Sequence, residues 1–331
     1  YSLLPLLVLT LTLYYHKEGV WLYGVVILVA VLLSLLLSSI LKYFLEGRQK
    51  SYIKGAFGKY ISPEVVEELI KNPDMLTLGG EERELSIFFS DIAGFTTISE
   101  KLPPKELVAM LNTYLDTLSK VILSSNGTID KYEGDAIIAF WNAPSLQENH
   151  ASLALKAALE CQERVKELNK RFGAELGIKL NTRIGINTGK VIVGNIGSSL
   201  RFDYSFIGDA GNFAARLEGA NKFFATNILI SEFTANKTDG GLGLREVGKI
   251  KVVGKTESVR VFEPCFYLED SQKEEFRNAL YMLYKTDIES ANTIFEKLSE
   301  IDPVSLRYTE IVEDIKRGDI VWDDGLILTS K

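Results

Sequence analysis

Two aspartates in this sequence each follow an apolar, strand-like run and lie close to a glycine. Asp91 comes after Leu85–Phe89, and Asp135 comes after Thr128–Tyr132. Carboxylates presented at two adjacent strand ends can hold two divalent cations about 3.5–4 Å apart, the spacing that supports in-line displacement at phosphorus. The pattern therefore predicts a site for two Mg²⁺ or Mn²⁺ ions and a nucleoside triphosphate.

The residues around Asp91 extend this predicted site. Asp91 alone cannot fill the shells of two ions, so we expect the backbone carbonyl of Ile92 to be a further metal ligand. Gly94 and Thr96 allow backbone N–H groups to approach phosphate oxygens, and Phe95 lies between them in the same predicted substrate-binding segment. The alternative for Asp91 is that it only caps the turn that follows.

Asn212 and Arg216 lie four residues apart on a helix predicted to follow Gly208, and so share one helix face. An arginine there can stabilise charge that develops on a transferring phosphorus, and an asparagine amide can orient a sugar oxygen. Without the other motifs, such a pair is more often solvated surface. We expect the nearby Glu218 to be an exposed ion-pair partner.

Arg183 lies in an otherwise apolar strand. An arginine in that setting pairs with an anion, either a structural carboxylate or a triphosphate. Lys131 lies across a tight turn from Asp135, so the two residues share one ribbon without having to face one cavity. That arrangement is natural if two copies pair. Of the two histidines, His150 is expected at the surface or as a helix cap, rather than in catalysis.

Composition narrows the classes of function. The 331 residues carry a net charge of −7, and their basic residues are scattered, so no nucleic-acid partner is expected. Cys161 and Cys265 are the only cysteines. A single possible pair of cysteines makes no disulfide framework, and neither cysteine is accompanied by other residues that bind metals. We therefore interpret both as reduced thiols in a cytosolic domain.

The first 45 residues are almost uncharged and predict a membrane hairpin. Val20–Leu41 is about 22 residues long, enough to cross a lipid bilayer as a helix. The shorter apolar stretch Ser2–Tyr15 precedes it, and we expect this first helix to be truncated by the start of the chain. A signal peptide is the alternative, but there is no small-residue cleavage site.

Basic residues follow the second apolar stretch, which predicts a multi-pass protein of the inner (plasma) membrane with a cytoplasmic C-terminal side. Residues 46–79 are then expected to form transducer or stalk helices. Two interpretations of this segment stay open, a linker packed on its own domain and a parallel dimer stalk that couples the membrane to the rest of the chain.

Residues 80–265 predict an α+β domain with a ferredoxin-like βαββαβ core. The expected elements are strand Leu85–Phe89, helix Pro104–Leu123, strands Thr128–Tyr132 and Ala136–Trp141, helix Ala151–Phe172, strands Leu180–Asn187 and Val191–Val193, and helix Asp209–Asn221. Residues 266–331 predict a small helical tail with a repeat-like pattern.

Four segments of this core make a family resemblance visible. They are Phe89–Thr96, Lys131–Asp135, Arg183–Gly189 and Asp209–Arg216. With these segments, residues 80–265 resemble the catalytic domain of class III nucleotidyl cyclases. The layout as a whole is similar to that of membrane-anchored bacterial adenylate cyclases that carry an extracytoplasmic sensor domain, here absent.

The resemblance implies a head-to-tail homodimer with its sites at the interface. One protomer would supply Asp91 and Asp135 as metal ligands and Arg183 for the triphosphate. The other protomer would supply the remaining residues, with Lys131 and Ser205 selecting the purine, Asn212 orienting the ribose and Arg216 stabilising the transition state. The implied reaction converts ATP to 3′,5′-cyclic AMP and pyrophosphate.

The purine preference also follows from hydrogen-bonding chemistry. A lysine with a small hydroxyl residue offers a donor to adenine N1 and an acceptor for its amino group, whereas guanine would want an acidic group at position 131. Two residues depart from the family pattern. Ser205 stands where Asp or Thr is commonest, and Val253 stands where a triphosphate lysine is frequent. Lys249, Lys251 or Lys255 could replace that lysine.

The alternatives are a guanylate cyclase that acts on GTP, and a catalytically silent dimeric sensor or interaction module. The four residues Asp91, Asp135, Asn212 and Arg216 argue against the silent module, because a silent domain needs none of them.

Overall fold

The computed structural model describes residues 29–42, 78–252, 258–318 and 326–328. The chain divides into two compact units, Tyr1–Val66 and Glu67–Lys331. In the first unit, residues 29–42 form a helix with exposed apolar side chains such as Leu33 and Leu36. No helix within the described ranges is long and apolar enough to cross a membrane. The rest of the predicted hairpin, nearly all of the predicted stalk and Val253 lie outside the described residues.

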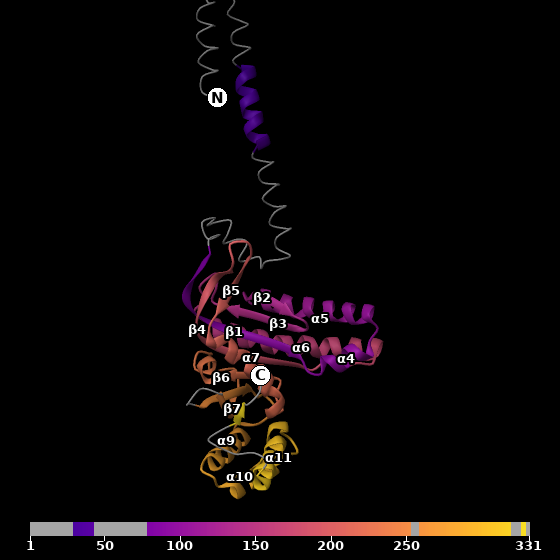
Figure 1. Cartoon of the computed structure of the whole chain (residues 1–331), viewed down its shortest axis with the longest axis vertical. Coiled ribbons are helices and arrows are strands. Elements are labelled where there is room, and N and C mark those ends of the chain that lie inside the picture. The colour runs from indigo at the N-terminus through magenta and orange to yellow at the C-terminus, as the bar shows by residue number, and fades with distance from the viewer. Residues whose placement is uncertain (1–28, 43–77, 253–257, 319–325, 329–331) are drawn as a thin grey trace, which may run out of the picture. The chain divides into compact units, whose positions relative to one another are not determined.

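The second unit is built on one mixed sheet, shown in Figure 1. Its elements, in chain order, are β1 (Gly79–Ile92), α4 (Phe95–Lys101), α5 (Pro104–Ser124), β2 (Thr128–Glu133), β3 (Ala136–Trp141), α6 (His150–Leu176), β4 (Thr182–Gly197), β5 (Phe202–Ile207), α7 (Asp209–Phe224), β6 (Ile228–Ser231), α8 (Glu232–Ala235), β7 (Leu244–Val252), β8 (Ser258–Pro264), α9 (Asp270–Tyr284), α10 (Ile288–Leu298), α11 (Pro303–Arg317) and β9 (Leu326–Leu328).

The first part of this sheet confirms the predicted ferredoxin-like core. Its strands lie in the order β2-β3-β1-β4, each antiparallel to its neighbour, with helices between β1 and β2 and between β3 and β4. Beyond β4 the sheet continues through β6, β8, β7 and β9, and β5 also pairs with β4. The α+β class is therefore the one that the alternating patterns predicted.

Strand β1 is the centre of the core because it is buried on both faces. Phe88 and Ile92 pack in a cluster with α5 and α6, whereas Leu85 and Ile87 belong to a second cluster that includes Ala214 of α7. Successive side chains of a strand point to opposite faces, so one apolar run serves both helical layers. The helices α5 and α6 thus cover one face of β1, and α7 covers the other.

Two strands are longer than the sequence pattern predicted. β1 begins at Gly79 rather than Leu85, and β4 is one strand of 16 residues rather than two short ones. The two strands pair without a break from Gly79↔Asn195 to Ile92↔Thr182. The backbone ladder continues through polar residues such as Glu82 and Lys190, which the apolar pattern could not reveal.

The predicted helical tail packs against the distal part of the sheet, where Figure 1 shows α9, α10 and α11 gathered next to β7. Phe276, Phe295 and Tyr308 are fully buried there, in one cluster with Phe224 of α7 and Ile250 of β7. The last described strand of the tail, β9, lies parallel to β7 at the edge of the sheet and was not predicted. The tail therefore shares a core with the sheet.

A buried ionic network joins the tail to the sheet. Arg245 of β7 donates hydrogen bonds to Glu263 of β8 at 2.8 Å and to Asp302 at 2.8 and 2.7 Å, and a further one to the hydroxyl of Tyr267 at 2.9 Å. Asp302 also caps α11 by accepting from the backbone N–H groups of Val304 and Ser305. One buried carboxylate thus balances a buried guanidinium and begins a helix.

We expect Asp302→Ala to lower the free energy of unfolding by about 3–5 kcal/mol, because it leaves Arg245 short of a partner and removes a helix cap. Urea unfolding of the purified chain measures this. Asp116→Ala removes an exposed ion pair with Lys120 and is the control, with an expected loss below about 0.5 kcal/mol. Equal losses in the two variants would contradict the role given to the network.

Candidate active site

The structure brings Asp91 and Asp135 together. Asp91 is the penultimate residue of β1, and Asp135 lies in the turn that joins β2 to β3. Because β3 pairs with β1, up to Ser90↔Ile137, that turn is held beside the end of β1. The backbone N–H of Ile92 donates a hydrogen bond of 3.0 Å to Asp135 Oδ2. The predicted meeting of the two carboxylates at adjacent strand ends is therefore present.

The two carboxylates repel each other when both are charged. Burial raises the pKa of Asp135 to about 6, and the proximity of Asp91 adds to the rise. A site of this kind favours either a proton or a cation. Carboxylate and carbonyl oxygens are the donors that hard divalent cations prefer, so Asp91, Asp135 and the Ile92 carbonyl fit Mg²⁺ or Mn²⁺.

Protein side chains alone would not fill the coordination shell of such an ion. The described residues contain no cluster of three or more His, Cys, Asp or Glu side chains that could hold a metal. Magnesium usually keeps several waters and binds through one or two carboxylates plus substrate phosphates. The donor set at the end of β1 therefore suits ions that arrive with a phosphorylated substrate.

The turn after β1 leads directly into a short helix. Gly94 has φ 71°, a left-handed conformation that glycine adopts without strain, and α4 begins at the next residue. Gly94 and Thr96 are exposed, and Phe95 packs partly against the core. The backbone of this segment is therefore accessible beside Asp91, as its predicted role in substrate binding requires.

Arg183 lies directly opposite Asp91 in the β1–β4 ladder. Its Nη2 donates a hydrogen bond of 3.1 Å to Asp91 Oδ2, and its Nε lies 2.9 Å from Glu218 Oε1. Of the two alternatives for this arginine, the structure shows the pairing with carboxylates. A contact with a triphosphate stays a prediction, although phosphate next to Asp91 would be within reach of the guanidinium.

Glu218 is the partner of an arginine, as predicted, but its predicted exposure is wrong. Only 15% of its side chain is exposed, because α7 lies close against β4. Gly185 permits this approach, since a Cβ there would lie 2.3 Å from the carbonyl oxygen of Ala214. Burial raises the pKa of Glu218 to about 7, even though Arg183 opposes that rise.

The same helix carries Asn212 and Arg216. Asn212 is exposed and Arg216 is half-buried. Across the part of the chain that the structure describes, neither side chain makes a hydrogen bond or an ion pair. Both polar groups are thus available to a ligand, and the structure leaves their predicted catalytic roles untested.

Lys131 and Ser205 form a second group around a residue that the sequence analysis missed. The Nζ of Lys131 lies 3.6 Å from Asp130 Oδ2, and only 3% of the Asp130 side chain is exposed. Ser205 of β5 is also buried, and its hydroxyl opposes the rise that burial causes in the pKa of Asp130. In the sequence, the one indication of a role for Asp130 is its position directly before Lys131. No hydrogen bond or ion pair among the described residues joins this group to Asp91 and Asp135.

His150 is the first residue of α6, whose N-cap is Asn149, so neither its predicted surface position nor its predicted role as a cap is correct. It is 6% exposed, and its Nδ1 lies 2.8 Å from the hydroxyl of Ser86 on β1. Glu84 Oε1 lies 3.7 Å from its Nε2. Burial lowers the pKa of His150. Its place in a buried polar chain explains why a histidine starts this apolar helix.

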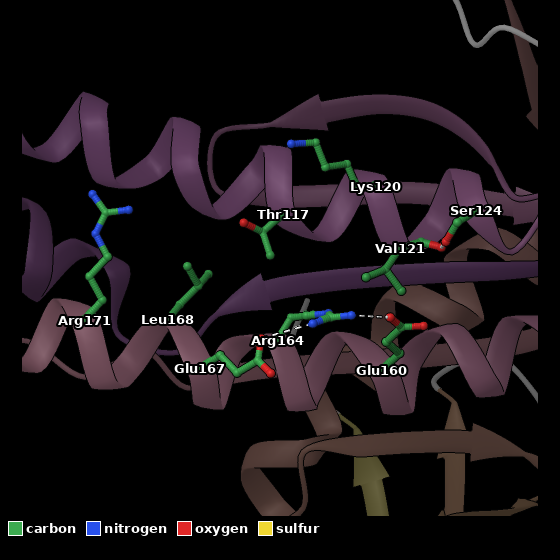
Figure 2. Close-up of a pocket in the computed structure, with 9 residues that line it drawn as sticks. All are labelled: Thr117, Lys120, Val121, Ser124, Glu160, Arg164, Glu167, Leu168 and Arg171. Carbon is green, nitrogen blue, oxygen red and sulfur yellow. Dashed lines mark hydrogen bonds and ion pairs between the residues drawn. The ribbon is translucent and has the colours of Figure 1, made fainter.

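A groove lies between α5 and α6 (Figure 2). It encloses 530 Å³ and is lined by charged side chains, of which Arg164 is paired with Glu160 at 3.0 Å and with Glu167 at 3.1 Å. None of the predicted site residues lines it. Both of its arginines are already paired with carboxylates, Arg171 with Glu175 at 3.1 Å, so this groove is not the candidate site.

Comparisons with known proteins agree with this geometry. Residues 80–265 match the family model described as the adenylate and guanylate cyclase catalytic domain. The chain belongs to this family. It is also similar to Adenylate cyclase 1 of Rhizobium meliloti, at 35% identity over 207 residues, which are 62% of this chain and 31% of that protein. The Adenylate cyclase of Anabaena cylindrica is 32% identical over 219 residues, or 64% of this chain and 41% of that one.

Solved cyclase structures resemble the same region. The adenylyl cyclase CyaB from P. aeruginosa has 36% identity and a TM-score of 0.54, over 58% of this chain and 99% of that one. The guanylyl cyclase Cya2 has 35% identity and a TM-score of 0.51, over 56% and 93%. The chain spans less than half the length of the two curated relatives named above. An adenylyl and a guanylyl cyclase thus resemble it about equally, and the resemblance does not decide between the two purines.

The buried carboxylate of this cyclase domain predicts a pH dependence. Glu218 has a pKa of about 7 in the folded chain against 4.5 ordinarily, so the folded state binds its proton more tightly than the unfolded state does. The stabilisation by this proton is complete below about pH 4.5 and is lost as the pH rises through about 7. We expect the free energy of unfolding of the native chain, minus that of Glu218→Gln, to fall by about 3 kcal/mol over this range.

Urea unfolding at several pH values measures this difference. Glu175→Gln, at an exposed glutamate of α6, controls for the change of residue type. A difference that rises with pH would mean that Glu218 is charged in the folded chain throughout.

Proposed function

We propose that this chain is an adenylate cyclase that converts ATP to 3′,5′-cyclic AMP and pyrophosphate. The observation that carries the proposal is the meeting of Asp91 and Asp135 at the end of β1, in a domain of the cyclase family. In the reaction the ribose 3′-oxygen forms a bond to the α-phosphorus, the bond from that phosphorus to the β-phosphate bridge breaks, and the 3′-hydroxyl proton passes to Asp91 or water. Two divalent cations held by Asp91, Asp135 and the Ile92 carbonyl would supply the positive charge for this step.

Each remaining residue has a role that suits its setting. Arg183 lies 3.1 Å from Asp91 and would bind the triphosphate beside it. Arg216 would meet the charge that develops on the α-phosphorus, and Asn212 would orient the ribose. Both residues lie on α7 and have no competing partner among the described residues.

The purine would be read by Lys131 and Ser205. A lysine ammonium donates to adenine N1, and a hydroxyl oxygen can accept from the adenine amino group. Guanine presents an N–H at position 1 and a carbonyl at position 6, and would meet a second donor at Lys131. This chemistry favours ATP over GTP.

A homodimer would complete the site, because no hydrogen bond or ion pair among the described residues joins Lys131 and Ser205 to Asp91 and Asp135. The strands β4 and β5 carry apolar side chains that a second copy could cover. Ile192 and Ile207 pair across these strands at 44% and 61% exposure, and Leu200 lies in the loop between them at 96%. In a head-to-tail pair, Lys131, Ser205, Asn212 and Arg216 of one protomer would face the carboxylates of the other.

Removing one carboxylate tests the proposal. We expect Asp135→Ala to lower cyclic AMP formation from ATP with Mn²⁺ or Mg²⁺ by at least a hundredfold, because a single carboxylate cannot hold two cations. Product analysis of the purified chain, with ATP and GTP side by side, measures this. Turnover that survives the substitution would refute the two-metal mechanism.

Mixing two inactive variants tests the dimer within the same assay. Asp135→Ala removes one of the carboxylates but keeps Arg216, and Arg216→Ala removes the arginine but keeps both carboxylates. If the halves come from different protomers, about half of randomly paired dimers are mixed and each carries one complete site. Activity should then return to roughly a quarter of the native value. No recovery after subunit exchange would place the whole site within one protomer.

We also propose that residues 1–45 anchor the protein in the inner membrane, as a multi-pass segment with the cyclase domain in the cytoplasm. The support is the uncharged run Val20–Leu41, the exposed apolar helix of residues 29–42, and the basic residues that follow.

After expression in a bacterial host, this chain should stay in the membrane fraction through an alkaline carbonate wash and enter the soluble fraction only with detergent. Residues 80–331 expressed alone are the matched comparison and should not need detergent. Release of the whole chain by carbonate would argue against an anchor that spans the bilayer.

A further inference from the structure

Arg183 lies between two carboxylates, those of Asp91 and Glu218. Its Nη2 donates a hydrogen bond of 3.1 Å to Asp91 Oδ2, and its Nε lies 2.9 Å from Glu218 Oε1. The side chains of Arg183 and Glu218 are 18% and 15% exposed. A guanidinium can bind one carboxylate through two parallel N–H groups, but here it divides its donors between two carboxylates. Its contact with Asp91 is therefore limited to one hydrogen bond.

The fold places Glu218 beside Arg183. Asp91 and Arg183 lie directly opposite each other in the β1–β4 ladder, so their side chains are on the same face of the sheet. Gly185 is two residues further along β4 and belongs to that face as well. A Cβ at Gly185 would lie 2.2 Å from the backbone nitrogen of Glu218. Because glycine has no Cβ, α7 approaches β4 closely enough for Glu218 to reach the guanidinium.

The contact between Arg183 and Glu218 is an attraction of charges without an aligned hydrogen bond. Within the described ranges, neither Arg183 Nε nor Glu218 Oε1 has a hydrogen-bond partner of normal geometry, although the two atoms are 2.9 Å apart. The energy of two charges depends on their distance and not on an angle. Glu218 can therefore hold Arg183 while the other nitrogens of the guanidinium change from one anion to another.

We propose that Glu218 is a positioning residue that prevents Arg183 from closing on Asp91, so that Asp91 stays available to a divalent cation. This inference rests on the proposed function, because it concerns the metal ligands of that site.

Competition for one carboxylate is the physical basis. Arg183 and a divalent cation are both positive and both bind Asp91, so each weakens the binding of the other. A second carboxylate at Nε draws the guanidinium away from Asp91. It also keeps Arg183 paired after a cation has replaced it at Asp91. A largely buried guanidinium is then never left without a partner, which would be costly.

The test uses Mn²⁺ alone as the probe. Its binding to the full chain without nucleotide is measured by electron paramagnetic resonance of the unbound ion at about pH 8, where Glu218 is charged because its pKa is about 7. For both Glu218→Gln and Glu218→Asp we expect the Kd of Mn²⁺ to rise roughly fivefold, about the effect of one ion pair. The aspartate keeps the charge but is too short to hold Nε.

Glu246→Gln is the matched control. Glu246 of β7 is 16% exposed and faces Arg260 at 3.9 Å, and three strands of the sheet separate β7 from β1. This substitution should leave the Kd of Mn²⁺ within about twofold.

The cyclase assay gives a second readout. In the Glu218 variants, the Mn²⁺ concentration that gives half-maximal turnover of ATP should rise by a similar factor. The kcat at saturating Mn²⁺ should stay within about twofold.

Arg183→Ala separates positioning from a purely structural role. Removing the competitor should tighten the binding of Mn²⁺, whereas the loss of an ion pair that only fastens α7 to β4 would weaken it. In this background, adding Glu218→Gln should change the Kd less than about twofold, because no guanidinium is left to hold. A native Kd in a folded Glu218→Asp chain would overturn the inference, and so would an equal rise in the Arg183→Ala background.

The outcomes also distinguish this inference from the proposed function. A native chain that neither binds Mn²⁺ nor cyclises a nucleotide refutes both. A native chain that cyclises ATP while the Glu218 variants keep the native Kd refutes the inference alone. A chain that shows the expected shifts in Kd but cyclises nothing refutes the function alone. If neither Glu218 variant folds, Arg183→Ala decides, because tighter binding of Mn²⁺ supports the competition and unchanged or weaker binding overturns it.

Discussion

The antiparallel pairing of β1 with both of its neighbours is the constraint on which the site depends. Pairing with β3 holds the turn that carries Asp135 beside the end of β1, and pairing with β4 places Arg183 opposite Asp91. The three charged groups are therefore positioned by backbone hydrogen bonds of a central, doubly buried strand. Such a ladder is rigid, which suits chemistry that requires two carboxylates to keep a short and constant separation.

The carboxylates near the end of β1 carry negative charge that the described part of the chain balances only in part. Burial raises the pKa of Asp135 and of Glu218, and among the described residues Arg183 pairs with Asp91 and Glu218. Two neighbouring carboxylates repel each other when both are ionised, and this repulsion lowers the stability of the folded chain. A bound cation would reduce the repulsion. This kind of local cost is common where function and stability compete.

The part of the sheet beyond the ferredoxin-like core is stabilised by the C-terminal helices. The strands β7 and β8 extend the sheet beyond the ferredoxin-like core and need cover, which α9, α10 and α11 provide through a shared apolar cluster. Arg245 is buried in that junction and is balanced by Glu263 and Asp302. Replacing such a network by apolar residues can be neutral, but breaking it is costly, so it fixes how the tail docks on the sheet.

The amino-acid sequence by itself determined the α+β class and the order of the core elements, and it pointed to Asp91, Asp135, Asn212 and Arg216 as candidate site residues, because local periodicity and short motifs carry that information. Only the tertiary structure decided what depends on contacts between distant segments. It buried Glu218, His150 and Asp130, joined β4 into one long strand, and brought the Lys131 ammonium to 3.6 Å from Asp130. Burial and the side to which a bulged residue points are set by neighbours in space, and a linear pattern does not contain them.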